Sequence, residues 1–256
     1  MSAALDTTAE AAVDVINPGG KGRVVLLCEH ASHHIPARYG DLGLAPADRL
    51  SHAAWDPGAL AVARRLSALL DAPLVASRIS RLVYDCNRPP EADSAMPERS
   101  ETVVVPGNRG LDPMARAERE ASVYRPFCDA AAEVLDPRPG AVLVTIHSFT
   151  PIFHGQPRAV EIGILHDSDT RIADAMLDQS GHLPHRRIAR NEPYGPADGV
   201  THSLRLHGIA RGLANVMIEI RNDLLTTPED QAALADEIHL LLQPALDALG
   251  TGGPNA

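Results

Sequence analysis

Long apolar runs that alternate with helical patterns most strongly constrain the fold of this chain. Apolar or β-branched residues dominate the segments 24–27, 72–80, 141–148, 159–167 and 214–223. Such uniform runs are typical of strands that are buried on both faces of a sheet. Helical patterns occur between or after them, at about 57–70, 112–135, 169–180, 201–211 and 228–249. This alternation predicts an α/β fold with a mostly parallel sheet that is covered on both faces. Residues 81–87 are expected to form a further strand or to continue the second.

The chain of 256 residues is expected to form a single domain over residues 21–250. Residues 1–20 end in the turn-forming sequence NPGGKG and are predicted to be a flexible leader, and residues 251–256 a disordered tail. Residues 89–110 are rich in Pro, Glu, Ser and Gly. A loop of this length inside a compact domain is usually functional, often as a lid or a binding loop.

The overall charge argues against several classes of partner. The chain has 23 basic and 33 acidic residues, a net charge of −10, which disfavours nucleic acid and anionic membranes as partners. No apolar run reaches the roughly 18 residues that a membrane span needs. The acidic N-terminal residues do not resemble a signal peptide, and Cys28, Cys86 and Cys128 make an odd count in apolar surroundings. Both features favour reduced thiols and a cytoplasmic protein.

Histidines gather where the apolar runs end. His30, His33 and His34 follow the first run directly, beside Glu29, and His147 ends another run. Ligands of open α/β folds bind at the carboxyl ends of the parallel strands. Imidazole is a common metal ligand, so these histidines are candidates for a metal site. The alternative is that they are hydrogen-bonded structural residues, which is the commoner role of a single histidine at a strand end.

Two carboxylates are further candidates for the same site, one at a helix N-terminus and one near a strand end. Asp56 precedes the helical pattern of 57–70, where it is either a helix N-cap or a metal ligand. Glu219 lies between Ile218 and Ile220 in a run that is otherwise apolar. A buried carboxylate must be paired or functional. Arg221 is therefore expected either to pair with Glu219 or to help bind a substrate.

The segment 77–90, SRISRLVYDCNRPP, carries several polar side chains after an apolar run. Asp85, Asn87 and Arg88 follow the run, and Arg78 and Arg81 precede them. Guanidinium groups are suited to bidentate binding of a carboxylate. The alternative is a solvated loop that closes the strand with Asx and Pro turns.

Six segments in this order resemble the N-formylglutamate amidohydrolase family: CEHASHHIP, AWDPGA, SRLVYDCNRP, VPGN, TIHSFTP and VMIEIRNDL. They span about residues 28–225, and their combination is more specific than any one of them. The family is related to zinc carboxypeptidases and aspartoacylases. The resemblance implies a three-layer α/β fold, with a central mixed sheet of about eight strands flanked by helices. It also implies metal-assisted hydrolysis of the amide of an N-acyl amino acid.

Residue by residue, the resemblance implies that His30 and His147 bind the metal and that Glu219 is the general base. Aspartoacylase-like enzymes use His-x-x-Glu for their first two ligands, whereas this chain has His30-Ala-Ser-His33. Asp56 is therefore our first choice for the second ligand, and His33 and Glu29 are the alternatives.

The Asp-x-Asn-Arg pattern of Asp85, Asn87 and Arg88 is similar to the segment that binds the substrate carboxylate in aspartoacylase-like enzymes. The resemblance thus implies an amidohydrolase that removes a formyl or other small acyl group from an acidic amino acid, such as N-formylglutamate. The substrate would be small and anionic. Zinc is the expected metal, although imidazole and carboxylate ligands also accept cobalt, manganese or iron. The alternatives are a deacylase of another N-acyl amino acid or small amide, and a non-catalytic relative that binds a carboxylate ligand.

Overall fold

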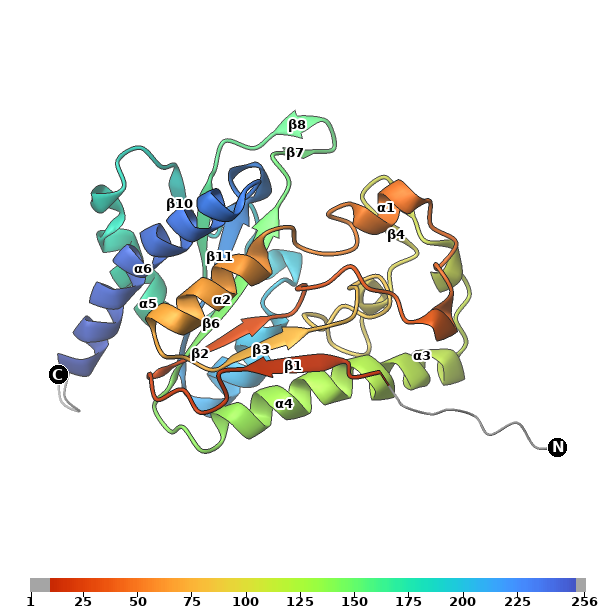
Figure 1. Ribbon diagram of the computed structural model, residues 1–256, viewed down its shortest axis with the longest axis horizontal. Coiled ribbons are helices and arrows are strands. Elements are labelled where there is room, and N and C mark those ends of the chain that lie inside the picture. The colour runs from red at the N-terminus through yellow and green to blue at the C-terminus, as the bar shows by residue number, and fades with distance from the viewer. Residues whose placement is uncertain (1–9, 252–256) are drawn as a thin grey trace.

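The computed structural model describes residues 10–251, which form a central sheet of seven strands covered by helices (Figure 1). The strand order is β1-β3-β2-β6-β11-β9-β10. The strands are β1 (Val13–Ile16), β2 (Val24–Cys28), β3 (Leu74–Ser77), β6 (Val142–Phe149), β9 (Ile162–Leu165), β10 (Ile188–Arg190) and β11 (Ala214–Arg221). Strands β3, β2, β6 and β11 are parallel neighbours, whereas β1 and β9 run antiparallel to β3 and β11. The predicted mostly parallel mixed sheet is confirmed, with seven strands where about eight were expected.

Helices cover both faces of this sheet. Helices α2 (Ala59–Leu69), α5 (Arg171–Asp178) and α6 (Pro228–Thr251) pack on one face, and α4 (Arg125–Leu135) packs on the other (Figure 1). Helix α3 (Pro113–Arg119) continues into α4 through a π-helical turn at Glu120–Tyr124. The short helix α1 (Pro46–Leu50) lies near the carboxyl ends of the strands (Figure 1). This arrangement is the expected three-layer α/β fold.

The alternation of side chains along the strands decides which residues face which helices. Val24, Leu26 and Cys28 pack toward α2 and α6, while Val25 and Leu27 pack toward α4. The apolar runs are therefore continuous because both faces of each strand are buried.

Strands β6 and β11 use the same alternation to place two polar residues on one face. Ile146 and Ile218 join the apolar layer on the α2 side. Because successive side chains point to opposite faces, His147 and Glu219 both project from the other face. The two residues are also direct partners in the parallel register of β6 and β11.

Three expectations about elements need correction. Residues Val13–Ile16, placed in the flexible leader, form the edge strand β1 beside β3. Residues 81–87 form turns and not a strand, because the chain leaves the sheet after Ser77. Residues 201–211 contain a π-helical turn and a 3-10 turn rather than a regular helix. The remainder of the predicted leader, residues 1–9, and tail residues 252–256 lie outside the described residues, and Thr251 is the last residue of α6.

Two small hairpins stand beyond the carboxyl ends of the central strands. One joins β4 (Arg99–Ser100) to β5 (Val103–Val104) inside residues 89–110, the segment predicted to be an irregular loop. The other joins β7 (Ile152–Phe153) to β8 (Gln156–Pro157). The backbone N–H of His154 donates a hydrogen bond of 2.9 Å to the Glu101 carboxylate and links their tips. No helix among residues 10–251 is long and apolar enough to cross a membrane.

Gly163 in β9 allows a neighbouring segment to approach the sheet closely. It is the antiparallel partner of Glu219. A side chain at this position would point to the face of the sheet opposite to that of Ile162 and Ile164. A Cβ atom at this position would collide with the backbone carbonyl oxygen of Glu192. The absent side chain therefore makes room for the segment that leads to Tyr194.

We expect the Gly163→Ala substitution to lower the free energy of unfolding by about 1–3 kcal/mol, because backbone must move to admit the new methyl group. Urea denaturation followed by circular dichroism measures this change. Gly181→Ala is the matched control, since a Cβ atom there meets nothing within 4 Å. Equal stability of the two variants would contradict this account of Gly163.

Candidate active site

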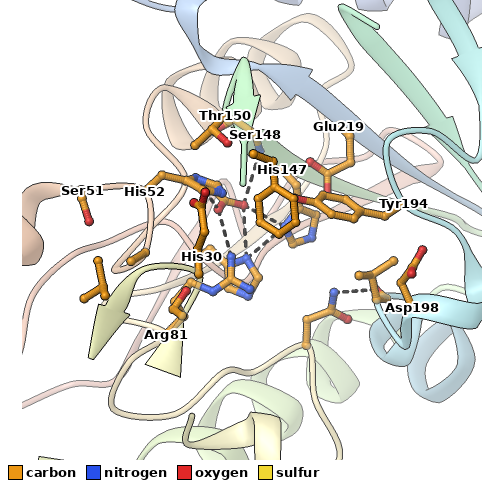
Figure 2. Close-up of a pocket in the computed structure, with 18 of the residues that line it drawn as sticks. His30, Ser51, His52, Arg81, His147, Ser148, Thr150, Tyr194, Asp198 and Glu219 are labelled. Carbon is orange, nitrogen blue, oxygen red and sulfur yellow. Dashed lines mark hydrogen bonds and ion pairs between the residues drawn. The ribbon is translucent and has the colours of Figure 1, made fainter. Parts of the chain in front are cut away.

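Polar side chains from three neighbouring strands meet at their carboxyl ends, next to a cavity of 570 Å³ (Figure 2). Glu29 and His30 directly follow β2, His147 lies in β6, and Glu219 lies in β11. The site residues that line the cavity are His30, Asp56, Arg81, Arg88, His147 and Glu219. All of the predicted metal ligands and the predicted general base are thus at one location.

Asp56 reaches this location because it does not cap the following helix. The N-cap of α2 is Gly58, with φ at +80°, and no side chain caps the helix. The N-cap role that was considered for Asp56 is therefore wrong. Its backbone N–H instead donates to the His30 carbonyl oxygen at 2.9 Å, which fastens the loop to the end of β2. This leaves the Asp56 carboxylate free to face the two histidines.

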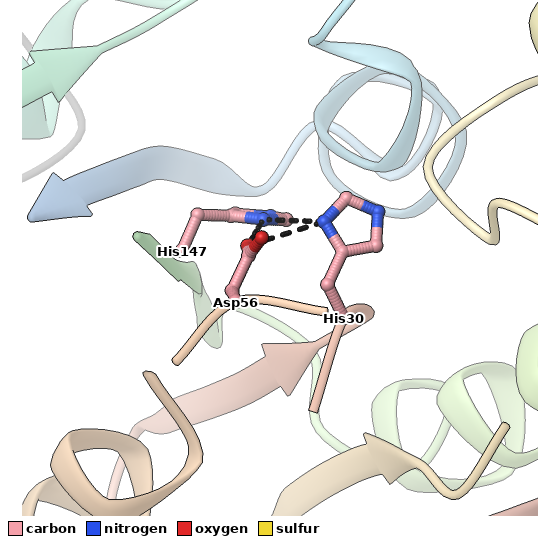
Figure 3. Close-up of side chains that lie close together, drawn as sticks. All are labelled: His30, Asp56 and His147. Carbon is pink, nitrogen blue, oxygen red and sulfur yellow. Dashed lines mark hydrogen bonds and ion pairs between the residues drawn. The ribbon is translucent and has the colours of Figure 1, made fainter. Parts of the chain in front are cut away.

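His30, Asp56 and His147 form a tight triangle of possible metal ligands (Figure 3). The Nδ1 atoms of the two histidines are 3.2 Å apart. The Asp56 Oδ2 atom lies 3.2 Å from Nδ1 of His30 and 2.9 Å from Nδ1 of His147. At zinc–ligand distances of about 2.0–2.1 Å, tetrahedral ligand atoms lie about 3.3 Å from one another. The spacing of these three atoms therefore fits a small divalent metal.

The second ring nitrogen of each histidine faces a carboxylate. Nε2 of His30 lies 2.6 Å from Asp85 Oδ1, and Nε2 of His147 lies 3.2 Å from Glu29 Oε2. The first pair is a hydrogen bond, whereas the second is within ion-pair distance without hydrogen-bond alignment. A carboxylate on the outer nitrogen holds the proton there and leaves the inner Nδ1 free to bind a metal. Glu29 and Asp85 therefore fit a role in orienting the two ligands.

The charge of the site also favours a cation. Four carboxylates are almost completely buried: Glu29, Asp56, Asp85 and Glu219 are 1, 1, 3 and 5% exposed. Arg81 pairs with Asp56 and Asp85, and Arg88 lies 3.8 Å from Asp85. The two arginines leave two negative charges, which a divalent metal would neutralise. Buried charge of one sign is costly unless it is compensated.

The pKa directions reflect the same crowding of carboxylates. Burial disfavours the charged form of His147, but Glu29 and Asp56 outweigh this effect and raise the pKa of His147 well above its ordinary value. Burial alone would raise the pKa of Asp56, yet His30, His147 and Arg81 hold that pKa well below the usual range. The carboxylate of Asp56 thus stays ionised between the imidazoles.

Glu219 differs from the other carboxylates of the site. Burial raises the pKa of Glu219 to about 7, with Asp56 adding to the rise and His147 opposing it. Its Oε2 atom has no hydrogen-bond partner among the described residues. The expected pairing of Glu219 with Arg221 is wrong, because Arg221 pairs with Asp223 at 2.8 Å and Glu161 at 3.6 Å. A buried carboxylate with an unpartnered oxygen at a cavity is available to accept a proton.

Only some of the predicted substrate-binding residues line the cavity. Arg88 and Asn87 line the cavity, whereas Arg221 is not among its lining residues. The Asn87 amide bonds the backbone at Val200 and Ser203, so it also holds that segment in place. Asp85 contacts His30 rather than the cavity.

Of the alternatives for the second ligand, His33 packs edge-on against Trp55, with ring centroids 5.1 Å apart, away from the site. Glu29 lies behind His147 and outside the triangle.

Sequence reasoning gave no role to three residues of the cavity wall: Arg81, His52 and Tyr194. Arg81 was noted only as a neighbour of the Asp85 segment. Its position four residues before Asp85 is the signal: Arg81 pairs with both Asp85 and Asp56, and Asp85 in turn bonds His30. His52 lies 3.6 Å from Asp56, and burial lowers the pKa of His52 to about 4. Tyr194 carries no signal in the sequence, because Gly163 and the fold bring it to the wall.

A His–Asp–His triangle at the carboxyl ends of parallel strands, open to a cavity and flanked by a free carboxylate, is typical of a metal-dependent hydrolase. Comparisons with known proteins agree with a hydrolase. The family model for N-formylglutamate amidohydrolase matches residues 22–226. None of the functionally curated proteins matches the sequence.

Solved structures similar to this chain include the two described next. The gene product Atu2144 from Agrobacterium tumefaciens is 54% identical, with a TM-score of 0.92 over 94% of this chain and 97% of that one. The N-formylglutamate amidohydrolase from Ralstonia eutropha JMP134 is 20% identical, with a TM-score of 0.69 over 94% of this chain and 99% of that one. The second likeness shows the shared fold. The chain belongs to the N-formylglutamate amidohydrolase family and is an amidohydrolase.

We expect the Glu29→Gln substitution to weaken the binding of added zinc by about 10- to 100-fold, because the neutral amide lacks the negative charge that favours a proton on Nε2 of His147 and leaves Nδ1 free. Competition with a chromophoric chelator measures the affinity. Glu133→Gln is the matched control, because Glu133 is exposed on α4. Equal zinc affinity of Glu29→Gln and wild type would remove Glu29 from this role.

Proposed function

We propose that this protein is a metal-dependent amidohydrolase that removes a formyl or other small acyl group from an acidic amino acid, with N-formylglutamate as the first candidate substrate. The observation that carries the proposal is the triangle of His30, Asp56 and His147 beside the unpartnered Glu219 carboxylate. Family membership supports amide hydrolysis as the reaction. The distances between the ligand atoms and the excess of buried carboxylates support a divalent metal, most simply zinc.

His30, Asp56 and His147 would hold the metal, which polarises the amide carbonyl and acidifies a water molecule when it is bound. Glu219 accepts a proton from the attacking water while the water oxygen bonds to the acyl carbon. Glu219 then delivers that proton to the amine nitrogen as the carbon–nitrogen bond breaks. For a formyl substrate the products are formate and the free amino acid.

Arg88 would bind the α-carboxylate of the substrate. It lines the cavity, and its Nη1 donates to the backbone carbonyls of Asp198 and Gly199, which fix the guanidinium in place. A preorganised guanidinium orients the carboxylate and hence the amide beside it. Asn87 anchors the same segment at Val200 and keeps this wall of the cavity rigid.

Glu219→Gln is expected to lower kcat by about 10²- to 10⁴-fold, because the amide cannot take the proton of the attacking water. Formate release from N-formylglutamate measures the rate, and elemental analysis should find the metal content unchanged. Glu133→Gln controls for the loss of one charge. Normal turnover by Glu219→Gln would remove Glu219 from the mechanism.

Protein purified without a histidine tag is expected to contain near one equivalent of a transition metal and to lose it in the His30→Ala variant. The physical reason is that His30 supplies one of only three ligand atoms in the triangle. Elemental analysis measures the content, and chelation followed by zinc addition should abolish and restore activity. A wild-type protein that takes up no metal would overturn the hydrolase mechanism and leave the carboxylate-binding alternative.

A further inference from the structure

Arg158 follows the β7–β8 hairpin and packs against two aromatic residues of the cavity wall. The centre of its guanidinium lies 4.4 Å from the Phe153 ring centroid and 4.7 Å from the Tyr194 ring centroid. Both of these aromatic residues line the cavity. A third ring centroid, that of the buried Phe149, lies 5.5 Å from the same guanidinium centre. Planar guanidinium groups stack favourably on aromatic faces, so the three rings hold Arg158 in one place.

Among the described residues, Arg158 has no carboxylate partner within ion-pair distance, unlike the two arginines that line the cavity. Arg81 is shared by Asp56 and Asp85, and Arg88 lies against Asp85. The hydrogen bond that Arg158 donates to the Thr150 carbonyl is long, at 3.5 Å. Arg158 also hydrogen-bonds the Tyr194 side chain. A guanidinium has five N–H donors, so several of them remain available to a ligand.

Tyr194 lies close to both Arg158 and the candidate base Glu219. Burial and the Glu219 carboxylate raise the pKa of Tyr194, and Arg158 opposes that rise. The Tyr194 side chain therefore lies under the influence of both the candidate base and this cation. Figure 2 shows Tyr194 and Glu219 on the same side of the cavity.

An acidic side chain of a substrate needs a cation at this wall. Asp48, Glu101 and Asp198 also line the cavity and would repel a second carboxylate. Arg88, if it binds the α-carboxylate, is not available for another. Like charges brought together in a partly desolvated cavity are unfavourable unless a counter-charge is present.

We infer that Arg158 is the specificity-determining residue that binds the side-chain carboxylate of an acidic N-acyl amino acid. The aromatic rings present its free N–H groups to the ligand, and Arg88 binds the α-carboxylate of the same molecule. This inference rests on the proposed function and adds to it the residue that distinguishes an acidic side chain from a neutral one of the same shape.

The test compares N-formylglutamate with N-formylglutamine, which has nearly the same shape but lacks the side-chain charge. For the wild type we expect kcat/KM to be at least tenfold higher with N-formylglutamate. Arg158→Gln should lower kcat/KM for N-formylglutamate by about 10- to 100-fold, chiefly through KM, as loss of a charge-assisted pair does. Its kcat/KM for N-formylglutamine should change by less than threefold. A merely structural role for Arg158 would lower both values together.

Arg64→Gln is the matched control, because Arg64 is exposed on α2 and is not part of the cavity wall. Arg158→Lys gives the same test if the Gln variant does not fold, since lysine keeps the charge but loses the fork; only the glutamate substrate should then be affected. Equal losses on both substrates, or a wild type without preference for the acidic one, would overturn the inference while leaving amide hydrolysis intact. A wild type that hydrolyses neither substrate would instead contradict the proposed function.

Discussion

The structure depends on compensating the negative charge of carboxylates that are buried at the ends of three parallel strands. Glu29, Asp56, Asp85 and Glu219 are almost inaccessible to water. Removing one partner from a buried ion pair typically costs about 3–5 kcal/mol, since the other charge is left unpaired. The imidazoles of His30 and His147, the Arg81 guanidinium and the proposed metal are therefore not independent features. Each one stabilises the ionised form of its neighbours, and the group functions as a unit.

The geometry of the site follows from ordinary features of the fold. Alternation along β6 and β11 turns His147 and Glu219 to one face, and the parallel register makes them neighbours. Backbone hydrogen bonds then fasten the loops: Asp56 N–H to the His30 carbonyl at 2.9 Å, and Ser80 N–H to the His34 carbonyl at 2.7 Å. Glycine at position 163 admits the segment that carries Tyr194 to the wall. His147 lies in a strand, and the backbone hydrogen bond between Asp56 and His30 holds the other two candidate ligands in place, which favours precise metal geometry.

The outer wall of the cavity differs from the triangle of His30, Asp56 and His147 in the elements that form it. Around the triangle, the Glu29, Asp56 and Asp85 carboxylates each have an ion-pair partner and are withdrawn from water. Farther out, the two hairpins contribute Glu101 and Phe153, and the tip-to-tip hydrogen bond joins them above the cavity. The chemistry of hydrolysis would thus belong to the strand ends, and substrate selection to the loops and hairpins. This division is common in α/β enzymes, because loops can vary without disturbing the sheet.

The sequence by itself determined the class of fold, since continuous apolar runs and intervening helical patterns permit few arrangements other than a covered parallel sheet. It also indicated His30, His147 and Glu219 as candidate site residues, because polar residues at the carboxyl ends of parallel strands converge at one edge of the sheet. Local patterns could not decide between Asp56 as a helix cap and Asp56 as a ligand, because both roles have the same sequence signature. They also could not show that Asp85 meets His30, that Arg221 pairs with Asp223 and Glu161, or that Arg158 stacks on the Phe153 ring of the cavity wall. Those contacts join residues whose side-chain directions are set only when the loops pack, so the tertiary structure alone decided them.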